Sequence, residues 1–356
     1  MKTAAKLKEA EPINVRRQAR SAVPEGRLSV GVLVGRLFSN TTSAIAVVLL
    51  LICIVLSQLS PGFLTAHNVY AVLAQSAVVG VAAVGGTFVI ITGGIDLSVG
   101  AAIGLAAMLG ALAVQHGYGA GIGILITLLV GLGIGAVNGV SVTALRLTPF
   151  IVTLATMGMA QGLTLQTNQG QSVYNLPAAL TIFGGGRILG GLPISVIATV
   201  IVFILGEILL KRTAFGKSVY AVGGNREAAR LAGIDVSRVT FLVYLLAGVC
   251  AGIAAILTVG RVGAATPTGG AGVELRVIAA IVIGGTSLFG GKGSLWGTLV
   301  GVLLIGVINN GLTLLNVDPF LVQFMQSALI FIAVLFDALN TRRIAGSRVN
   351  PTRTAS

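Results

Sequence analysis

The stretch "IITGGIDLSVG" at residues 90–100 places one carboxylate, that of Asp96, inside an otherwise apolar part of the chain. Gly93 and Gly94 permit backbone angles that a helix does not use, so a helix is expected to end there. Asp96 and Ser98 then stand at the next apolar run, where a carboxylate can accept hydrogen bonds from the free N–H groups of a helix start. A carboxylate at membrane depth is also a candidate for contacting a polar substrate or gating a pathway. The sequence leaves both roles open for Asp96.

A second glycine-rich break lies in "GGTSLFGGKGSLWG", residues 284–297. Gly290 and Gly291 interrupt the apolar pattern, and Ser294 precedes the next apolar run. We expect Ser294 to cap that run as Asp96 caps its own. Because this second break contains no acid, it favours the capping role of Asp96.

The other reactive side chains form no catalytic constellation. His67 and His116 lie far apart in the sequence without an acidic cluster, so neither metal binding nor acid–base catalysis is expected. Cys53 and Cys250 lie in apolar runs, where a thiol behaves as a small hydrophobic group. "KRTAFGKS" nearly matches the phosphate-binding pattern G-x-x-x-x-G-K-[ST], but Lys211 replaces its first glycine and no strand precedes it. We expect no enzyme activity, no metal and no cofactor bound by this chain.

Composition indicates the environment of these residues. The chain has 356 residues, of which 55% are hydrophobic and 9% are charged, and its mean hydropathy is +0.99. An average soluble domain carries about 25% charged residues. Repeated apolar runs of about 20 residues are long enough to cross a membrane as helices. The sequence predicts an all-α polytopic membrane protein rather than a β-barrel.

Proline, glycine and charged residues divide the apolar runs into about ten predicted transmembrane helices. These lie near residues 42–59, 69–92, 97–115, 119–142, 149–166, 192–210, 239–259, 274–288, 295–314 and 319–339. The eighth is short and begins with "ELR", so a re-entrant segment is the alternative, and a total of eight spans stays open. Runs such as "GLGIGAVNG" (131–139) supply the small residues that let membrane helices pack closely.

The net charge of +13 is explained by topology. Most Lys and Arg residues lie in the two tails and in the loops on one side of the predicted membrane. The loops on the other side carry only Arg187, Arg261 and Arg276. By the positive-inside rule, both termini are cytoplasmic. Basic residues beside spans contact anionic lipid, so we expect lipid and no nucleic acid among the partners. The predicted regions are a basic tail (1–41), a transmembrane domain (42–340) with a cytoplasmic loop (211–238), and a basic tail (341–356).

Two segments of the chain resemble each other. They are "IGAVNGVSVTALRLTPFIVTL" at 134–154 and "IGVINNGLTLLNVDPFLVQF" at 305–324, with Asn138 opposite Asn309 or Asn310. In the ten-span topology they point in opposite directions, which predicts an inverted internal repeat with a pathway at the repeat interface. The candidates for a polar pathway lining are Asn138, Gln161, Asn309 and Asn310.

One long polar segment separates two spans, at residues 211–240. Within it "NREAARLAG" predicts a short helix with Asn225 as N-cap, Glu227 in the first turn and Gly233 as terminator. Local features alone leave two roles open for this helix: presentation to a soluble partner, or an amphipathic connection between two spans.

Taken together, these segments resemble the permease subunits of bacterial ATP-binding-cassette (ABC) importers for monosaccharides, the ribose, xylose and arabinose group. The related branched-chain amino-acid permeases share the general architecture. The resemblance rests on "ITGGIDLSVG", "TPFIVTLATM", "YAVGGNREAARLAGI", "AAIVIGGTSLFGGKGSLWGTLVG" and "INNGLTLL", in family order from about residue 70 to 340. "EAARLAG" is similar to the E-A-A-x-x-x-G motif that couples such permeases to their ATPase. The resemblance implies a coupling role for Gly223, Gly224, Asn225, Glu227, Ala228, Ala229 and Gly233.

The resemblance also implies a translocation subunit for a ribose-like pentose or related sugar in the bacterial inner membrane. The implied partners are an ABC ATPase subunit that uses ATP and Mg, a periplasmic sugar-binding protein, and a second permease copy in a homodimer or heterodimer. A branched-chain amino-acid or polyol permease is the alternative within the superfamily. An ion-coupled secondary transporter is the rival from another class, and Asp96 is its candidate coupling residue, because Glu207, Glu274 and Asp337 lie near predicted span ends.

Overall fold

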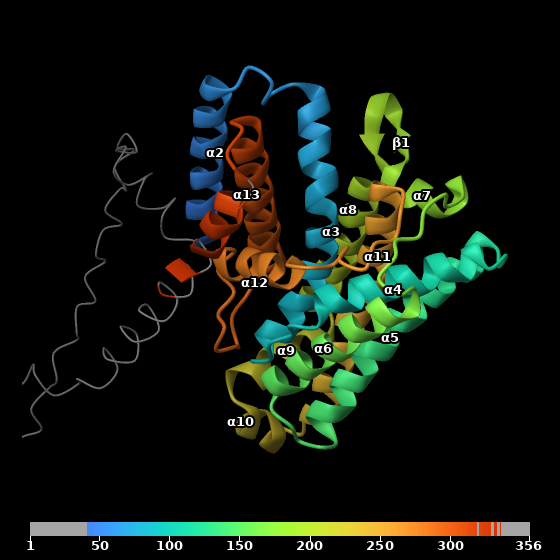
Figure 1. The fold of residues 1–356 in the computed structure, drawn as a ribbon. Coiled ribbons are helices and arrows are strands. Elements are labelled where there is room, and N and C mark those ends of the chain that lie inside the picture. Colours follow the sequence, from blue (N-terminus) through green and yellow to red (C-terminus); the bar gives the residue numbers. More distant parts are fainter. Residues whose placement is uncertain (1–40, 319, 329–330, 333–334, 336–356) are drawn as a thin grey trace, which may run out of the picture.

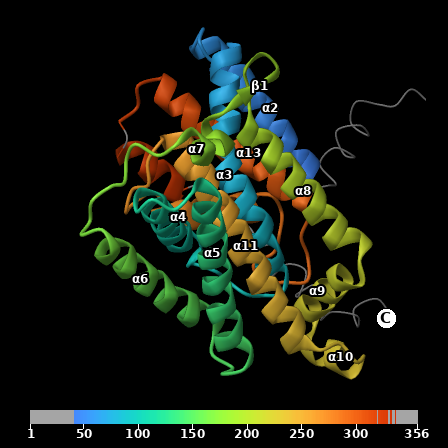
Figure 2. The same ribbon diagram turned by 90° about the vertical axis from the view of Figure 1, so that its right-hand side faces the viewer.

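The computed structural model describes residues 41–318, 320–328, 331–332 and 335. The predicted tails, apart from Thr41, and much of the tenth predicted span lie outside the described residues. Figures 1 and 2 show a bundle of helices in the order α2 (Thr41–Leu59), α3 (Ala66–Ile91), α4 (Val99–Gln115), α5 (Ala120–Thr143), α6 (Pro149–Thr167), α7 (Ala178–Gly185), α8 (Ile194–Arg212), α9 (Ala214–Gly224), α10 (Arg226–Leu231), α11 (Val236–Val262), α12 (Val273–Ile283) and α13 (Leu295–Leu314).

The all-α prediction is confirmed. Six helices are long and apolar enough to cross a membrane, namely α2, α3, α5, α8, α11 and α13, and α4 is a further apolar helix of 17 residues. Within the described residues, the only sheet is a hairpin of β1 (Arg187–Ile188) and β2 (Leu192–Pro193). The chain is a multi-pass membrane protein.

Helix α12 differs from the other predicted spans that the structure describes. It has 11 residues, so at 1.5 Å per residue it is about 17 Å long, against a hydrocarbon core of about 30 Å. Its N-cap, Gly272, adopts a left-handed conformation with φ 74°, which separates α12 from the preceding turns. The eighth predicted span is therefore not a single membrane-crossing helix, because α12 is too short to cross a membrane by itself.

Helices α3 and α11 form the centre of the bundle. In their most apolar stretches, 83% of the α3 residues and 72% of the α11 residues are buried, against 6% for α2. Figure 2 shows α3 and α11 enclosed between α8 on one side and α4 and α5 on the other. The apolar surface of α2 is left to face lipid, as expected for an outer helix.

Small residues bring α5 and α11 into backbone contact, as the "GLGIGAVNG" run predicts. A β-carbon added at Gly131 would lie 2.5 Å from the carbonyl oxygen of Gly248, and one added at Gly135 would lie 3.0 Å from the Cα of Gly248. Only glycine permits this approach, and close packing of this kind is the main force between helices in lipid.

The two repeat segments end at opposite ends of the bundle. Helix α5 ends beside the start of α11, where a β-carbon at Gly139 would contact the Phe241 ring, whereas α13 ends beside the start of α3, where Asn310 is hydrogen-bonded to Asn68. This antiparallel placement agrees with an inverted repeat. We call the side of the molecule that carries α10 the α10 end, and the side with the loop between α2 and α3 the opposite end (Figure 1).

Candidate functional site

Helix α10 is the short helix that the sequence predicts. The Oδ1 atom of Asn225 accepts a hydrogen bond from the backbone N–H of Ala228 at 3.0 Å, so Asn225 is the N-cap. Glu227 lies in the first turn and forms an ion pair of 2.7 Å with Arg230. Gly233 follows the helix with φ 83°, a conformation suited to a glycine terminator.

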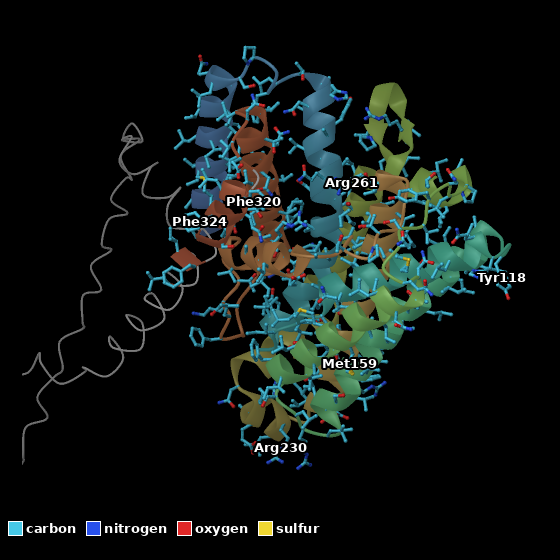
Figure 3. All side chains as sticks on the ribbon, viewed as in Figure 1. Tyr118, Met159, Arg230, Arg261, Phe320 and Phe324 are labelled. Carbon is cyan, nitrogen blue, oxygen red and sulfur yellow. The ribbon has the colours of Figure 1, made fainter. Side chains whose placement is uncertain are left out.

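The outer face of α10 is exposed. The side chains of Glu227 and Arg230 are 64% and 71% exposed, and Leu231 is 80% exposed. Ala229 is buried and anchors the other face of the helix. Figure 3 shows Arg230 at the tip of the α10 end. This exposed face of α10 is accessible to a partner.

Three glycine pairs, Gly93–Gly94, Gly223–Gly224 and Gly290–Gly291, supply residues that contact one another near α10. The backbone N–H of Gly291 donates to the carbonyl oxygen of Ile91 at 2.9 Å. A β-carbon at Gly223 would overlap that same oxygen and lie 2.7 Å from the Gly291 nitrogen. One at Gly290 would lie 3.0 Å from both the Gly223 oxygen and the Gly93 nitrogen. We call Gly93, Gly223, Gly290 and Gly291 the glycine junction.

Two side chains reinforce the glycine junction. The Nη2 atom of Arg226 donates to the carbonyl oxygen of Thr92 at 3.4 Å, and the hydroxyl of Tyr220 donates to that of Gly293 at 2.8 Å. The Nζ atom of Lys211 donates to the Tyr220 hydroxyl at 3.0 Å. The segment containing α9 and α10 therefore contacts both membrane loops, the one after α3 and the one before α13.

The other two glycines of these pairs differ from each other. A β-carbon at Gly94 would lie 2.8 Å from the hydroxyl oxygen of Tyr244, so Gly94 packs against α11. A β-carbon at Gly224 would meet no atom of the described residues within 4 Å. Gly224 thus borders the glycine junction, but the space around it admits a side chain.

Asp96 lies at the start of α4 in a polar cluster. Its Oδ1 atom accepts hydrogen bonds from the backbone nitrogen of Ser98 at 2.8 Å and from the Ser98 hydroxyl at 2.6 Å. The Nδ2 atom of Asn138 donates to the Ser98 hydroxyl at 2.8 Å. Thr153 of α6 donates to the carbonyl oxygen of Ile95 at 3.1 Å. The structure thus joins three predicted residues, Asp96, Ser98 and Asn138, through one chain of hydrogen bonds.

This Asp96 cluster has unused hydrogen-bonding capacity. The Oδ1 atom of Asn138 and the hydroxyl of Tyr244 are buried without a hydrogen-bond partner in the described part of the chain. Buried polar atoms are rarely left unsatisfied unless a water, an ion or a function accounts for them. A hollow of about 10 Å³ borders Asp96 between α3, α4, α11 and α12, which is about the size needed for one water.

The capping role predicted for Ser294 is wrong. Ser294 occupies the N-cap position of α13, but its side chain makes no capping hydrogen bond. The backbone carbonyl of Ser294 accepts from Thr298 at 3.0 Å, and the adjoining turn is fixed by close contact between Gly284 and Gly297. Helix α4 also starts without a side-chain cap, because its N-cap is Ser98 and the Asp96 carboxylate accepts from the N–H of Ser98 rather than from the first turn of the helix.

The four candidate pathway residues do not meet at one point. Asn138 belongs to the Asp96 cluster. Asn310 exchanges two amide hydrogen bonds with Asn68, at 2.9 and 2.7 Å, and its side chain is thereby engaged in joining α13 to α3. Asn309 accepts from Gln326 and borders a small hollow with Arg276. Gln161 lines a separate cavity with Glu274.

Sequence reasoning missed Thr153, Glu274 and Arg276 as members of polar sites. Glu274 lies near a span end as expected, in the first turn of the half-length helix α12, and it also lines the cavity that contains Gln161. The signal available was the "ELR" start of a short span, which marks a broken helix. Among the described residues, no three His, Cys, Asp or Glu side chains are grouped as metal ligands would be.

The described residues thus form a helical membrane bundle with internal polar clusters and a capped, exposed helix at one end. The chain matches the family described as "Branched-chain amino acid transport system / permease component" over residues 68–334. It belongs to this family of permeases.

Individual relatives cover most of the chain. It is 43% identical over 291 residues to the ribose import permease protein RbsC of Bacillus subtilis strain 168, covering 81% of this chain and 90% of that protein. It is 42% identical over 295 residues to RbsC of Escherichia coli K12, covering 82% and 92%. The D-allose transport system permease protein AlsC of the same strain is 38% identical over 294 residues, covering 82% and 90%. No solved structure matches the chain.

Proposed function

We propose that this chain is the transmembrane subunit of an ATP-driven ABC importer that carries a ribose-like monosaccharide into the cytoplasm. The observation that carries the proposal is the exposed helix α10 and its contact, through the glycine junction, with two loops of the membrane bundle. The relatives support the cargo, because those at 42–43% identity are named ribose import permeases and one at 38% is named a D-allose permease.

In the proposed mechanism, a cytoplasmic ATPase binds α10 and a periplasmic binding protein delivers sugar at the opposite end. Closure of the ATPase on ATP moves α10, and the glycine junction passes this movement to the end of α3 and the loop before α13. Backbone contacts transmit displacement well because no flexible side chain intervenes. ATP and Mg belong to the ATPase, and this chain contributes movement and a pathway rather than covalent chemistry.

The proposed setting is the bacterial inner membrane, with both termini and α10 in the cytoplasm. The concentration of basic residues in the tails and in loop 211–238 supports this orientation. The apolar outer faces of α5, α6 and α8 carry many exposed large side chains, including Leu129, Leu163 and Leu205. These faces suit contact with lipid and with a second copy of the permease.

The four candidate pathway residues are uncharged amides, which agrees with a neutral cargo, although Glu274 and Arg276 line the cavities of Gln161 and Asn309. Three of the four candidate pathway residues already make protein hydrogen bonds as amides, and the fourth, Gln161, is an uncharged amide in a cavity. Polyols would use the same hydroxyl chemistry, whereas a branched-chain amino acid needs partners for two charged ends. The ion-coupled rival rests on Asp96, whose Oδ1 atom is already engaged by Ser98.

Partner capture from native membranes tests the proposal. The tagged chain is purified in gentle detergent and its partners are identified by mass spectrometry, with Glu227→Lys purified in parallel. We expect an ABC ATPase with the wild-type chain and its loss with Glu227→Lys. Recovery of the wild-type chain alone, together with sugar uptake driven by a proton or sodium gradient, would contradict the proposal.

A further inference from the structure

A cavity of about 90 Å³ lies between α4, α6 and the turns that precede α12. A single water needs about 10–15 Å³, so this cavity has room for several water molecules or part of a small polar ligand. Its lining includes Gln161, Thr164, Thr268 and Glu274 as polar side chains and Met157 as an apolar one.

Two helix starts meet at this cavity. A β-carbon at Gly100, in the first turn of α4, would lie 2.5 Å from the carbonyl oxygen of Gly270 and would overlap the Oε2 atom of Glu274. The Oε1 atom of Glu274 accepts from the backbone nitrogen of Gly272 at 3.2 Å. Glu274 is thus held in place by its own helix start while its carboxylate borders the cavity. Broken helices that converge in this way are typical of substrate sites in transporters.

Helix α6 supplies the facing wall. Met157, Gln161 and Thr164 follow one another at spacings of four and three residues, so they share one face of α6. The Thr164 hydroxyl donates to Ala160 at 2.7 Å, which leaves its oxygen free to accept. The Gln161 amide makes no hydrogen bond within the described part of the chain, so both its donors and its acceptor are available.

The same helix connects this cavity to the Asp96 cluster. Thr153 contacts the loop before α4, and Met157 and Gln161 follow it by one and two helical turns. At the start of α4, Ser98 belongs to the Asp96 cluster and Gly100 lines the cavity, and the two residues are two positions apart. The Asp96 cluster and the cavity are therefore neighbouring polar sites at the start of α4.

We propose that this cavity is a subsite for the hydroxyl groups of the transported sugar, with Glu274 as hydrogen-bond acceptor and Gln161 as donor and acceptor. This inference rests on the proposed function and adds residues to it. A carboxylate on one wall, with an amide and an apolar methionine on the facing wall, matches the hydroxyl groups and C–H faces of a monosaccharide.

Two measurements on the full-length protein test the subsite. Saturation-transfer NMR with D-ribose on the purified wild-type chain detects sugar contact directly, without ATPase or binding protein. Uptake of labelled ribose by the complete importer in proteoliposomes detects transport. The variants are Glu274→Gln, which keeps the acceptor for Gly272, Gln161→Ala, and Ala101→Leu, which fills the cavity from α4. Gln166→Ala is the control, because it removes the same amide from α6 outside the cavity lining.

We expect all three cavity variants to lose the ribose NMR signal, and Gln166→Ala to keep it. Uptake by Glu274→Gln should fall by about tenfold, equivalent to about 1.4 kcal/mol, at unchanged affinity of the binding protein for ribose. Absence of a ribose signal with the wild-type chain, or equal signals from wild type and the three variants, would overturn the subsite. A ribose signal without ATP-driven uptake would instead overturn the proposed function and leave the subsite supported.

Discussion

The glycine junction and the cavity beside α6 connect broken helices by different means. At the junction, backbone atoms of three segments touch, so a movement of one segment displaces the others. At the cavity, two helix starts meet but side chains from a third helix remain apart, so the space is open to a ligand. Under the two proposals above, the junction transmits movement and the cavity holds a polar molecule.

The largest expected effect is at the glycine junction. Gly223→Ala adds a β-carbon that overlaps the Ile91 carbonyl oxygen, and overpacking of this kind costs about 1–3 kcal/mol. We expect ATP-driven uptake to be abolished while the chain remains in the membrane and still co-purifies with the ATPase. The matched control is Gly224→Ala, whose β-carbon has open space and should leave uptake unchanged. Normal uptake by Gly223→Ala would show that the junction does not transmit movement.

The next effect separates docking from transmission. Glu227→Lys breaks an exposed ion pair with Arg230, and such pairs contribute about 0–1 kcal/mol to stability, so the fold should be retained. If α10 binds the ATPase as proposed, charge reversal on its exposed face should weaken ATPase binding by about tenfold or more, equivalent to at least about 1.4 kcal/mol. Co-purification at graded ATPase concentrations measures this change. Wild-type affinity of the Glu227→Lys variant for the ATPase would show that Glu227 is not part of the binding surface.

The Asp96 cluster gives a smaller effect that falls on stability. Asp96→Asn exchanges a carboxylate for an amide at the hydrogen bonds from Ser98, and a weakened buried hydrogen bond costs about 1–3 kcal/mol. We expect a lower Tm in detergent and less protein in the membrane, with unchanged preference among sugars. Wild-type yield combined with altered sugar preference would show that Asp96 contributes to the pathway rather than to the stability of α4.

The smallest effect concerns Asn310. A double-mutant cycle of Asn68→Ala and Asn310→Ala should give a coupling energy of about 0.6 kcal/mol, the average for hydrogen bonds between membrane helices. Uptake per folded molecule should stay unchanged. A large loss of uptake with Asn310→Ala and none with Asn68→Ala would support the pathway role that the sequence predicts for Asn310.

The α10 end is predicted well because its structure is local. Asn225, Glu227 and Gly233 specify a cap, a first turn and a terminator through neighbours at most a few residues away, and the structure has each of them. Even so, the sequence did not indicate that Gly93, Gly223 and Gly291 touch. Each pair signals a break in its own segment, and their meeting depends on how α3, α9 and α13 pack.

The interior is predicted less well for the same reason. Asn138 and Ser98 were identified as separate candidates, and the 40-residue separation between them is closed only by packing of α4 against α5. The sequence predicts Gln161 and the span-end position of Glu274 separately. It does not reveal that both line one cavity, because hydropathy reports position along a span and not which side chains face each other. Ser294 fails as a cap because glycine contacts nearby fix the start of α13 without it.

The most direct test of the central claim is ribose uptake by proteoliposomes that contain this chain and its ATPase, with the binding protein outside. The reaction is run with ATP, with a non-hydrolysable ATP analogue, and with an imposed proton or sodium gradient in place of ATP. We expect uptake with ATP but not with the analogue or the ion gradient, insensitive to an uncoupler and lost in Gly223→Ala. Uptake that follows the ion gradient and ignores ATP would contradict it.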